Sequence, residues 1–227
     1  MTAPIDPPVR VWDLPTRIFH WLLAATLVGS VTSAKIGGEA MAWHFRFGYL
    51  VFTLLAFRLV WGLVGGRWSR FSSFIFAPRT TLAYLRGRVP PGVLVDVGHN
   101  PLGNFSVFAL LGVLALQVAT GLVADDEIAN SGPLNRFVAS ATALAATGWH
   151  KNYGQWLVIG LVALHLAAIA WYVWGKRVVI VRPMVSGDKA LPAGTPASAD
   201  GTRERLLALL LAALCAAGVI WLVRLGG

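Results

Sequence analysis

Cysteine is almost missing from this chain of 227 residues. The one thiol, Cys215, lies inside an apolar stretch near the C-terminus. A single cysteine excludes an internal disulfide, and without CxxC or CxxCH motifs the chain cannot carry a cysteine-ligated iron–sulfur cluster or covalently attached haem. We interpret Cys215 as a small apolar residue.

Charge is also scarce. Only 13% of the residues are charged, 56% are hydrophobic, and the mean hydropathy is +0.66, far more apolar than a soluble domain. A membrane span needs about 20 apolar residues, and five segments qualify, namely 17–36, 43–65, 104–123, 149–174 and 205–224. We therefore predict an all-α integral membrane protein that contacts lipid, a four-helix transmembrane bundle with an appended fifth transmembrane helix.

The N-terminal residues contain prolines and acids but no apolar core. We expect no cleavable signal peptide there, so the first span itself directs insertion.

The net charge of +9 is distributed unevenly along the chain. Thirteen of the 19 basic residues precede the first span, follow the second or separate the fourth from the fifth. In a five-span topology these positions share one side, which is the positive-inside pattern. The pattern predicts a multi-pass protein of the bacterial inner membrane with a cytoplasmic N-terminus, and it argues against a nucleic-acid partner.

The segments between the spans suggest three parts. Residues 1–185 form the four-helix domain, residues 186–204 (SGDKALPAGTPASADGTRE) have the composition of a flexible cytoplasmic linker, and residues 205–227 form the additional helix. The apolar stretch 134–146 is too short to span, and we expect it to form a helix along the membrane surface.

Four of the five histidines lie in or at the ends of the apolar runs. His20 is near the cytoplasmic start of span one, whereas His44 and His150 begin spans two and four near the external face. His165 lies fifteen residues beyond His150, about 22 Å deeper at 1.5 Å per residue. Fifteen residues at about 100° each also bring His165 to within about 60° of His150.

The histidines thus form two depth-matched pairs, His20 with His165 and His44 with His150. Ionisable residues at membrane depth usually serve a site, and histidine is a common axial ligand of haem iron. We predict two bis-histidine haems b, which transfer electrons because no iron position stays open. A lone histidine could instead hydrogen-bond across helices. Zinc usually needs a fuller shell than two nitrogens.

Two arginines are candidate partners for haem propionates. Arg58 lies fourteen residues past His44, about 21 Å deeper and level with the cytoplasmic haem. A propionate would compensate a buried guanidinium, although Arg58 could also snorkel toward the headgroups. Arg67 could serve the same haem.

The chain resembles bacterial di-haem cytochrome b561 proteins, in particular the cytochrome b subunit of nickel–iron hydrogenases. The matching stretches include VWDLPTRIFHWLLA, HFRFGYLVFTLLAFRLVWGLVG, GHNPLGNFSVFALLGVLALQVATGL, WH…VALHLAAI and RPMVSGDK, within residues 11–189. The resemblance implies that the four span histidines ligate two haems b. The spacing from His150 to His165 is one residue longer than the family's fourteen, which predicts altered winding around Asn152–Gly154.

His99, in GHNPLGN, stands at the entrance to the third span. A capping and turn role is the simpler interpretation. The alternative gives His99 proton exchange at a quinone site beside the cytoplasmic haem.

We therefore expect a cytochrome that moves electrons between the quinone pool and an external redox partner such as a hydrogenase or a cytochrome c. An alternative is a self-sufficient quinone-linked oxidoreductase that acts on a small external substrate such as superoxide. A third hypothesis is a haem-free transporter or anchor whose histidines bind metal ions or protons.

Overall fold

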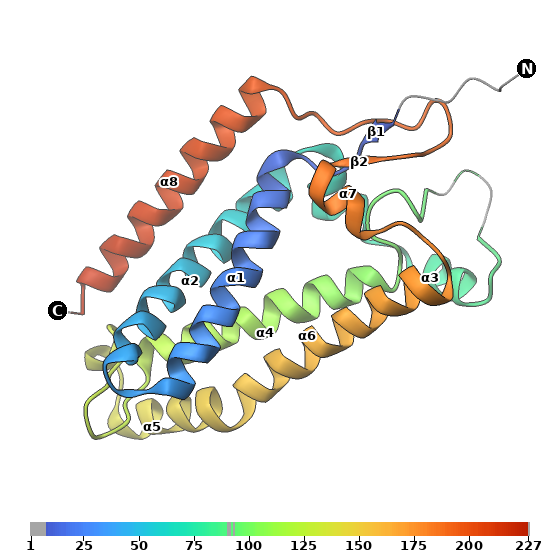
Figure 1. Cartoon of the computed structure of the whole chain (residues 1–227). Helices are drawn as coiled ribbons and strands as arrows, with labels where there is room; N and C mark the ends of the chain where they lie inside the picture. Colours follow the sequence, from blue (N-terminus) through green and yellow to red (C-terminus); the bar gives the residue numbers. More distant parts are fainter. Residues whose placement is uncertain (1–7, 90–91, 93, 227) are drawn as a thin grey trace, which may run out of the picture. The chain divides into compact units, whose positions relative to one another are not determined.

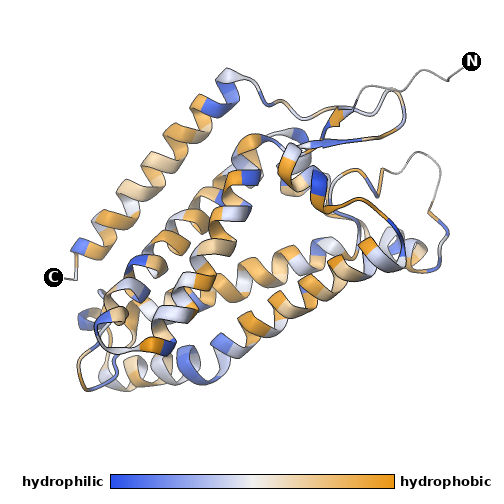
Figure 2. Cartoon of the chain, in the orientation of Figure 1, coloured by the Kyte–Doolittle hydropathy of each residue, from blue (hydrophilic) through white to orange (hydrophobic). Residues whose placement is uncertain are grey.

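The computed structural model describes residues 8–89, 92 and 94–226. In this part of the chain, five helical stretches are long and apolar enough to cross a membrane (Figure 1). They are α1 (Leu14–Ile36), α2 (Met41–Val64), α4 (Gly103–Val123), the stretch Ser140–Gly175 and α8 (Thr202–Arg224). Figure 2 shows apolar residues along these helices, with more hydrophilic residues at many of their ends. The all-α membrane fold is confirmed.

The fourth span is a composite helix. It consists of α5 (Ser140–Gly148), the π-helix η5 (Trp149–Gly154), α6 (Gln155–Ala170) and a second π-helix, η6 (Trp171–Gly175). A π-helical turn accommodates an additional residue within a helix, so η5 confirms the altered winding predicted from the long His150–His165 spacing.

The expected helix over 134–146 forms only in part, and its position along the membrane surface stays a prediction. Its first part forms the short η4 (Asn135–Phe137), and its second part is α5, which continues into η5 without a break. Alanine-rich residues favour the helix strongly enough to extend the fourth span instead of starting a new element.

Short elements connect the spans. They are η1 (Gly38–Ala40), η2 (Arg67–Ser69), η3 (Phe71–Ser73), α3 (Pro78–Leu85) and α7 (Val181–Ser186). Strand β1 (Val9–Arg10) pairs antiparallel with β2 (Asp188–Lys189), with Val9 opposite Lys189.

The chain divides into two compact units, and we describe each by itself. The first unit comprises Met1–His20, Arg58–Val107 and Leu166–Leu209, and the second comprises Trp21–Phe57, Phe108–His165 and Leu210–Gly227. The core of the first unit is formed by Val11, Trp12, Trp68 and Val97. The core of the second is formed by Val51, Leu55, Leu114 and Val158, on helices α2, α4 and α6.

Asp13, in the first unit, caps α1. Its fully buried carboxylate accepts hydrogen bonds from the backbone N–H of Thr16 (2.8 Å) and Gly66 (3.1 Å). The indole N–H of Trp61 (3.2 Å) and the hydroxyl of Ser69 (2.6 Å) also donate to it. An N-cap carboxylate satisfies amides that the first helical turn leaves free, and here it also ties α1 to the end of α2.

Residues 188–200 are fastened to the N-terminal segment. Besides the β1–β2 pairing, the hydroxyl of Ser198 donates to the carbonyl of Val11 (2.8 Å), and the indole N–H of Trp68 donates to the carbonyl of Pro196 (2.7 Å). Asp200 forms an ion pair with Arg10 (3.0 Å) and another with Arg205 (3.2 Å). These contacts tie the stretch 188–200 to the first unit, and the division into a domain, a linker and an additional helix stays a prediction. We call Asp13, Asp200 and their hydrogen-bonding partners the N-terminal clamp.

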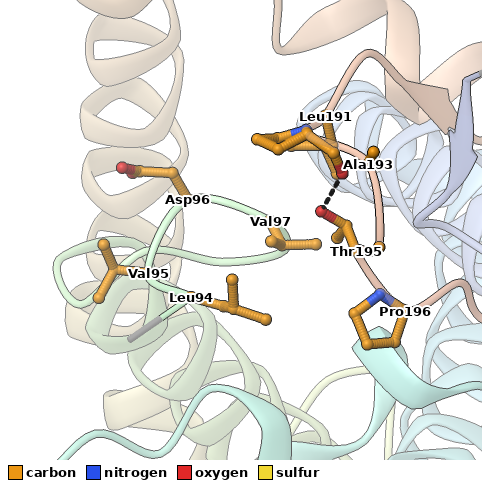
Figure 3. Close-up of a pocket in the computed structure, with 10 residues that line it drawn as sticks. Leu94, Val95, Asp96, Val97, Leu191, Ala193, Thr195 and Pro196 are labelled. Atoms are coloured by element: carbon orange, nitrogen blue, oxygen red, sulfur yellow. Dashed lines mark hydrogen bonds between the residues drawn. The ribbon is translucent and has the colours of Figure 1, made fainter. Parts of the chain in front are cut away.

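A hollow of about 360 Å³ lies beside this segment. Residues 94–97 and 191–196 line it, and the hydroxyl of Thr195 donates to the carbonyl of Pro192 at 2.7 Å (Figure 3). Two chain segments that are far apart in sequence thus meet in the first unit.

Candidate haem-binding site

The second unit brings His44 and His150 together, as the sequence predicts. His44 lies in the first turn of α2, and His150 is the second residue of η5. Their ring centroids are 5.9 Å apart, and their planes are nearly perpendicular, at 86°. Both rings are partly buried. We call these two residues with Ser30 and Gln117 the outer histidine site.

Each of the two rings is oriented by a backbone carbonyl. Nδ1 of His44 lies 2.9 Å from the carbonyl oxygen of Ser30 on α1, and Nδ1 of His150 lies 2.9 Å from the carbonyl oxygen of Gln117 on α4. A carbonyl oxygen can only accept, so Nδ1 carries the proton in both rings. The lone pair of each imidazole is consequently on Nε2, the state in which histidine binds a metal ion.

This spacing would allow His44 and His150 to hold one haem iron between them. An imidazole nitrogen binds a metal ion at about 2 Å, which places the ring centroids of two opposed ligands about 6 Å apart. Across the described residues, no group of three or more His, Cys, Asp or Glu side chains gathers as a metal site.

Gly121 gives the ring of His150 its space. A Cβ atom at this position of α4 would lie 3.0 Å from Cε1 of His150. A side chain there would therefore displace the ring, so this glycine shapes the outer histidine site.

The other predicted pair is placed only in part. His20 lies on α1 and His165 on α6, and both are partly buried. His20 belongs to the first unit and His165 to the second. Their pairing stays a prediction.

Arg58 is enclosed by protein. It is only 3% exposed, and its guanidinium lies 4.6 Å from the ring centroid of Phe71 and 6.0 Å from that of Phe19. In the part of the chain that is described, its Nη1 atom has no hydrogen-bond partner. The snorkelling alternative is therefore wrong, and the atom can bind an anionic oxygen. Arg67, in contrast, is exposed beside Trp68, and its role stays a prediction.

His99 packs between two aromatic rings of the first unit. Its ring centroid is 4.8 Å from that of Trp12 and 4.6 Å from that of Phe74. Asn100 caps α4, because its side-chain oxygen accepts from the N–H of Gly103 at 2.7 Å. The predicted capping motif is thus confirmed for Asn100, whereas a quinone role for His99 stays a prediction.

A chain of polar side chains continues from this cap. The amide of Asn100 donates to the hydroxyl of Tyr172 at 2.8 Å, and that hydroxyl lies 3.2 Å from the hydroxyl of Tyr84 on α3. Burial and the hydrogen bond to Tyr172 raise the pKa of Tyr84. Tyr84 therefore stays neutral at physiological pH.

The acidic loop between α4 and α5 is ordered by its own acids. The carboxylate of Asp126 accepts from the backbone N–H of Ala129 (2.9 Å). It also accepts from the backbone N–H of Asn130 (2.8 Å) and from the side-chain amide of Asn130 (2.7 Å). These bonds, led by the Asn130 side chain, lower the pKa of Asp126. Asp126 therefore stabilises the conformation of its own loop.

Several residues of these networks are absent from the sequence prediction, and three of them show why. Gln117 could have been noticed as a polar residue inside an apolar run, and Asp13 as an acid just before Leu14–Pro15, a helix-start signal. Ser30 contributes its backbone carbonyl to His44, and such a role leaves no signal in the sequence.

Comparison with known proteins finds several relatives that carry similar names. A protein described as a probable Ni/Fe-hydrogenase B-type cytochrome subunit from Cupriavidus necator is 30% identical over 210 residues, covering 78% of this chain and 85% of that relative. Similarly named proteins from Bradyrhizobium diazoefficiens and Escherichia coli K12 are 26% and 25% identical. The first alignment covers 81% of this chain and 86% of the relative, and the second covers 69% and 80%.

No solved structure gives a significant match. A family model described as prokaryotic cytochrome b561 matches residues 11–187, which include all four span histidines, Arg58 and His99. The chain therefore belongs to the prokaryotic cytochrome b561 family, a membership that implies haem b within its membrane helices.

Proposed function

We propose that this chain is a di-haem cytochrome that moves electrons across the bacterial inner membrane, between the quinone pool and an external redox protein. The observation that supports it most strongly is the pair His44–His150, whose Nε2 atoms both carry lone pairs. His20 and His165 would hold the second haem. A bis-histidine haem supplies one-electron transfer without an open iron position.

The residues of the chain orient the histidine ligands and provide an apolar environment. The carbonyls of Ser30 and Gln117 hold the two outer imidazoles in the ligating tautomer. In the same unit, the buried side chains of Val51, Leu55, Leu114 and Val158 pack against one another. An apolar surrounding disfavours uncompensated charge, so it influences the reduction potential of a bound haem.

Arg58 supplies the charge for the second haem. Its buried Nη1 can donate to a propionate, and the ring of Phe19, which precedes His20, lies 6.0 Å from the guanidinium. Asp13 is close enough to attract the same guanidinium electrostatically.

A hydrogenase is the first candidate for the external partner. The relatives from Cupriavidus necator and Escherichia coli are named as hydrogenase cytochrome subunits. The basic residues concentrated on one side favour a cytoplasmic N-terminus, and in that orientation His44 and His150 would lie near the external face. Electrons from the partner would enter at this pair and leave toward quinone at the other.

The test is a reduced-minus-oxidised optical spectrum of the purified chain with quantification of haem. We expect two b-type haems per chain. His44→Ala or His150→Ala should remove one of them, and His20→Ala or His165→Ala the other. A wild-type chain with one haem or none contradicts the proposal.

The quinone link has its own test. His99→Leu should slow the oxidation of dithionite-reduced protein by a soluble quinone analogue and leave both haem spectra unchanged. Unchanged oxidation kinetics would show that His99 serves only the packing between Trp12 and Phe74.

A further inference from the structure

Gln117 contacts His150 in two ways. Its backbone oxygen accepts from Nδ1 of the His150 ring (2.9 Å), and its side-chain amide donates to the backbone carbonyl of His150 (2.8 Å). From these contacts we propose that Gln117 is the positioning residue that fixes His150 as an axial haem ligand. The inference rests on the proposed function, because it concerns the same haem.

The side chain of Gln117 holds this position at a cost. Its Oε1 atom is buried and, within the described residues, lacks a hydrogen-bond partner. An unsatisfied buried acceptor destabilises a fold, because its bonds to water are lost without replacement. The amide nevertheless points its N–H group at His150, because a reversed amide would bring two oxygens together.

Gly154 makes this arrangement possible. It is the last residue of η5, the same π-helix that contains His150. A Cβ atom on Gly154 would lie 1.9 Å from Oε1 of Gln117, so the amide rests directly on the glycine backbone. The wider π-helical turn and the missing side chain together admit Gln117.

The contacts of Gln117 control both the backbone and the ring of His150. A hydrogen bond at Nδ1 sets the rotation of an imidazole and strengthens Nε2 as a donor to iron. At the partner ligand, Ser30 contributes a carbonyl at 2.9 Å and a hydroxyl at 3.2 Å to the ring of His44, both at Nδ1. The hydrogen bond from the side chain of Gln117 to the backbone carbonyl of His150 therefore distinguishes His150 from His44. His150 lies in η5, the π-helical turn that accommodates an additional residue.

The first experiment replaces Gln117 by Met, which has a similar length and no amide. The backbone oxygen of residue 117 still accepts from Nδ1 in this variant, so only the side-chain hydrogen bond to the His150 backbone is lost. In the purified full chain, the haem between His44 and His150 should be held about 10-fold more weakly, the lower end for such outer partners. Its midpoint potential and its low-spin EPR signal, which depends on the angle between the imidazole planes, should shift. The second haem should stay unchanged and serves as the internal reference.

The outcomes separate the two proposals. If the wild-type chain lacks the haem at His44 and His150, the proposed function fails. If the wild-type chain has both haems and Gln117→Met changes neither content, potential nor EPR signal, the positioning role is wrong and the proposed function stands.

A second variant reaches His150 chiefly through Gln117. A Cβ on Gly154 would lie 1.9 Å from Oε1 of Gln117, and also 3.0 Å from Nε1 of Trp149. Gly154→Ala should displace the amide and reproduce the effect of Gln117→Met. In a Gln117→Ala background, Gly154→Ala should add only the small effect of the Trp149 contact, because the shortened side chain removes the closer clash. Gly160→Ala on α6 is the matched control, since a Cβ there meets nothing within 4 Å. Additive losses in the double variant contradict the inference.

Discussion

The outer histidine site and the N-terminal clamp satisfy their polar groups in opposite ways. The two imidazoles of the site are held by uncharged carbonyls of Ser30 and Gln117. In the clamp, the carboxylates of Asp13 and Asp200 collect N–H, O–H and guanidinium donors.

The difference follows from what each region must do. A ligand to iron needs a neutral imidazole with a free lone pair, and a carbonyl secures that state without introducing a charge. Segments that are distant in sequence need strong and specific links, which charge-assisted hydrogen bonds provide. Substitutions in the clamp should therefore act on stability, and substitutions at the site on haem.

The largest effect is expected for Asp13→Ala. It leaves the donors of Trp61, Gly66 and Ser69 without an acceptor and removes the nearby anion of Arg58. Loss of one partner from such a buried network costs about 3–5 kcal/mol, measured as a lower unfolding midpoint in detergent. Glu39→Ala on the exposed η1 is the control. Equal unfolding midpoints for the two variants would show that Asp13 does not stabilise the fold.

Gly121→Ala should break the site while sparing the clamp. The new methyl group, 3.0 Å from Cε1 of His150, forces the ring to move. We expect about 10–100-fold weaker retention of one haem with a nearly unchanged unfolding midpoint. Gly112→Ala on the same helix meets nothing within 4 Å and should keep both haems. Full haem content in Gly121→Ala would show that the ring of His150 tolerates the added methyl group.

Asp200→Ala should loosen residues 188–200. Arg10 and Arg205 lose their shared carboxylate, and the backbone N–H of Leu14 loses its acceptor at 3.0 Å. Loss of hydrogen bonds to a charged group corresponds to about 1–3 kcal/mol, which limited proteolysis of this segment detects as faster cleavage. Cleavage at the wild-type rate would mean that β1–β2 and Ser198 suffice.

The smallest effect concerns the loop at Asp126. Its hydrogen bonds lower the pKa of this carboxyl below the ordinary value of about 4. The stabilisation is therefore complete above that value and disappears as the pH falls toward the folded-state pKa. Asn130→Ala removes the leading donor and should raise the pKa of Asp126, which a carboxyl NMR titration measures.

The spans were predictable because their signal is repeated over many residues. Apolar runs located all five helices to within a few residues, apart from the N-terminal extension of the fourth. The pair His44–His150 followed from depth alone, and the extra residue before His165 predicted the irregular winding that η5 confirms.

The remaining features depend on contacts that composition does not encode. Residues 186–204 look like a linker because they are small and polar, yet the same small residues permit β pairing and the close approach of Ser198 to Val11. The carbonyls that orient the histidines are backbone groups, and every residue of the chain has one. The residue type therefore gives no sign of this role. Only tertiary structure tells which carbonyl faces a ring.

The link between Ser198 and Val11 joins positions 187 residues apart. At a synthesis rate of about 5–20 residues per second, roughly 10–40 s separate their emergence from the ribosome. During that interval β1 has no partner strand, because β2 begins only at Asp188. The β1–β2 closure is thus among the last events of biogenesis, and a nascent chain that stops before Asp188 exposes a bare strand edge to the quality-control machinery.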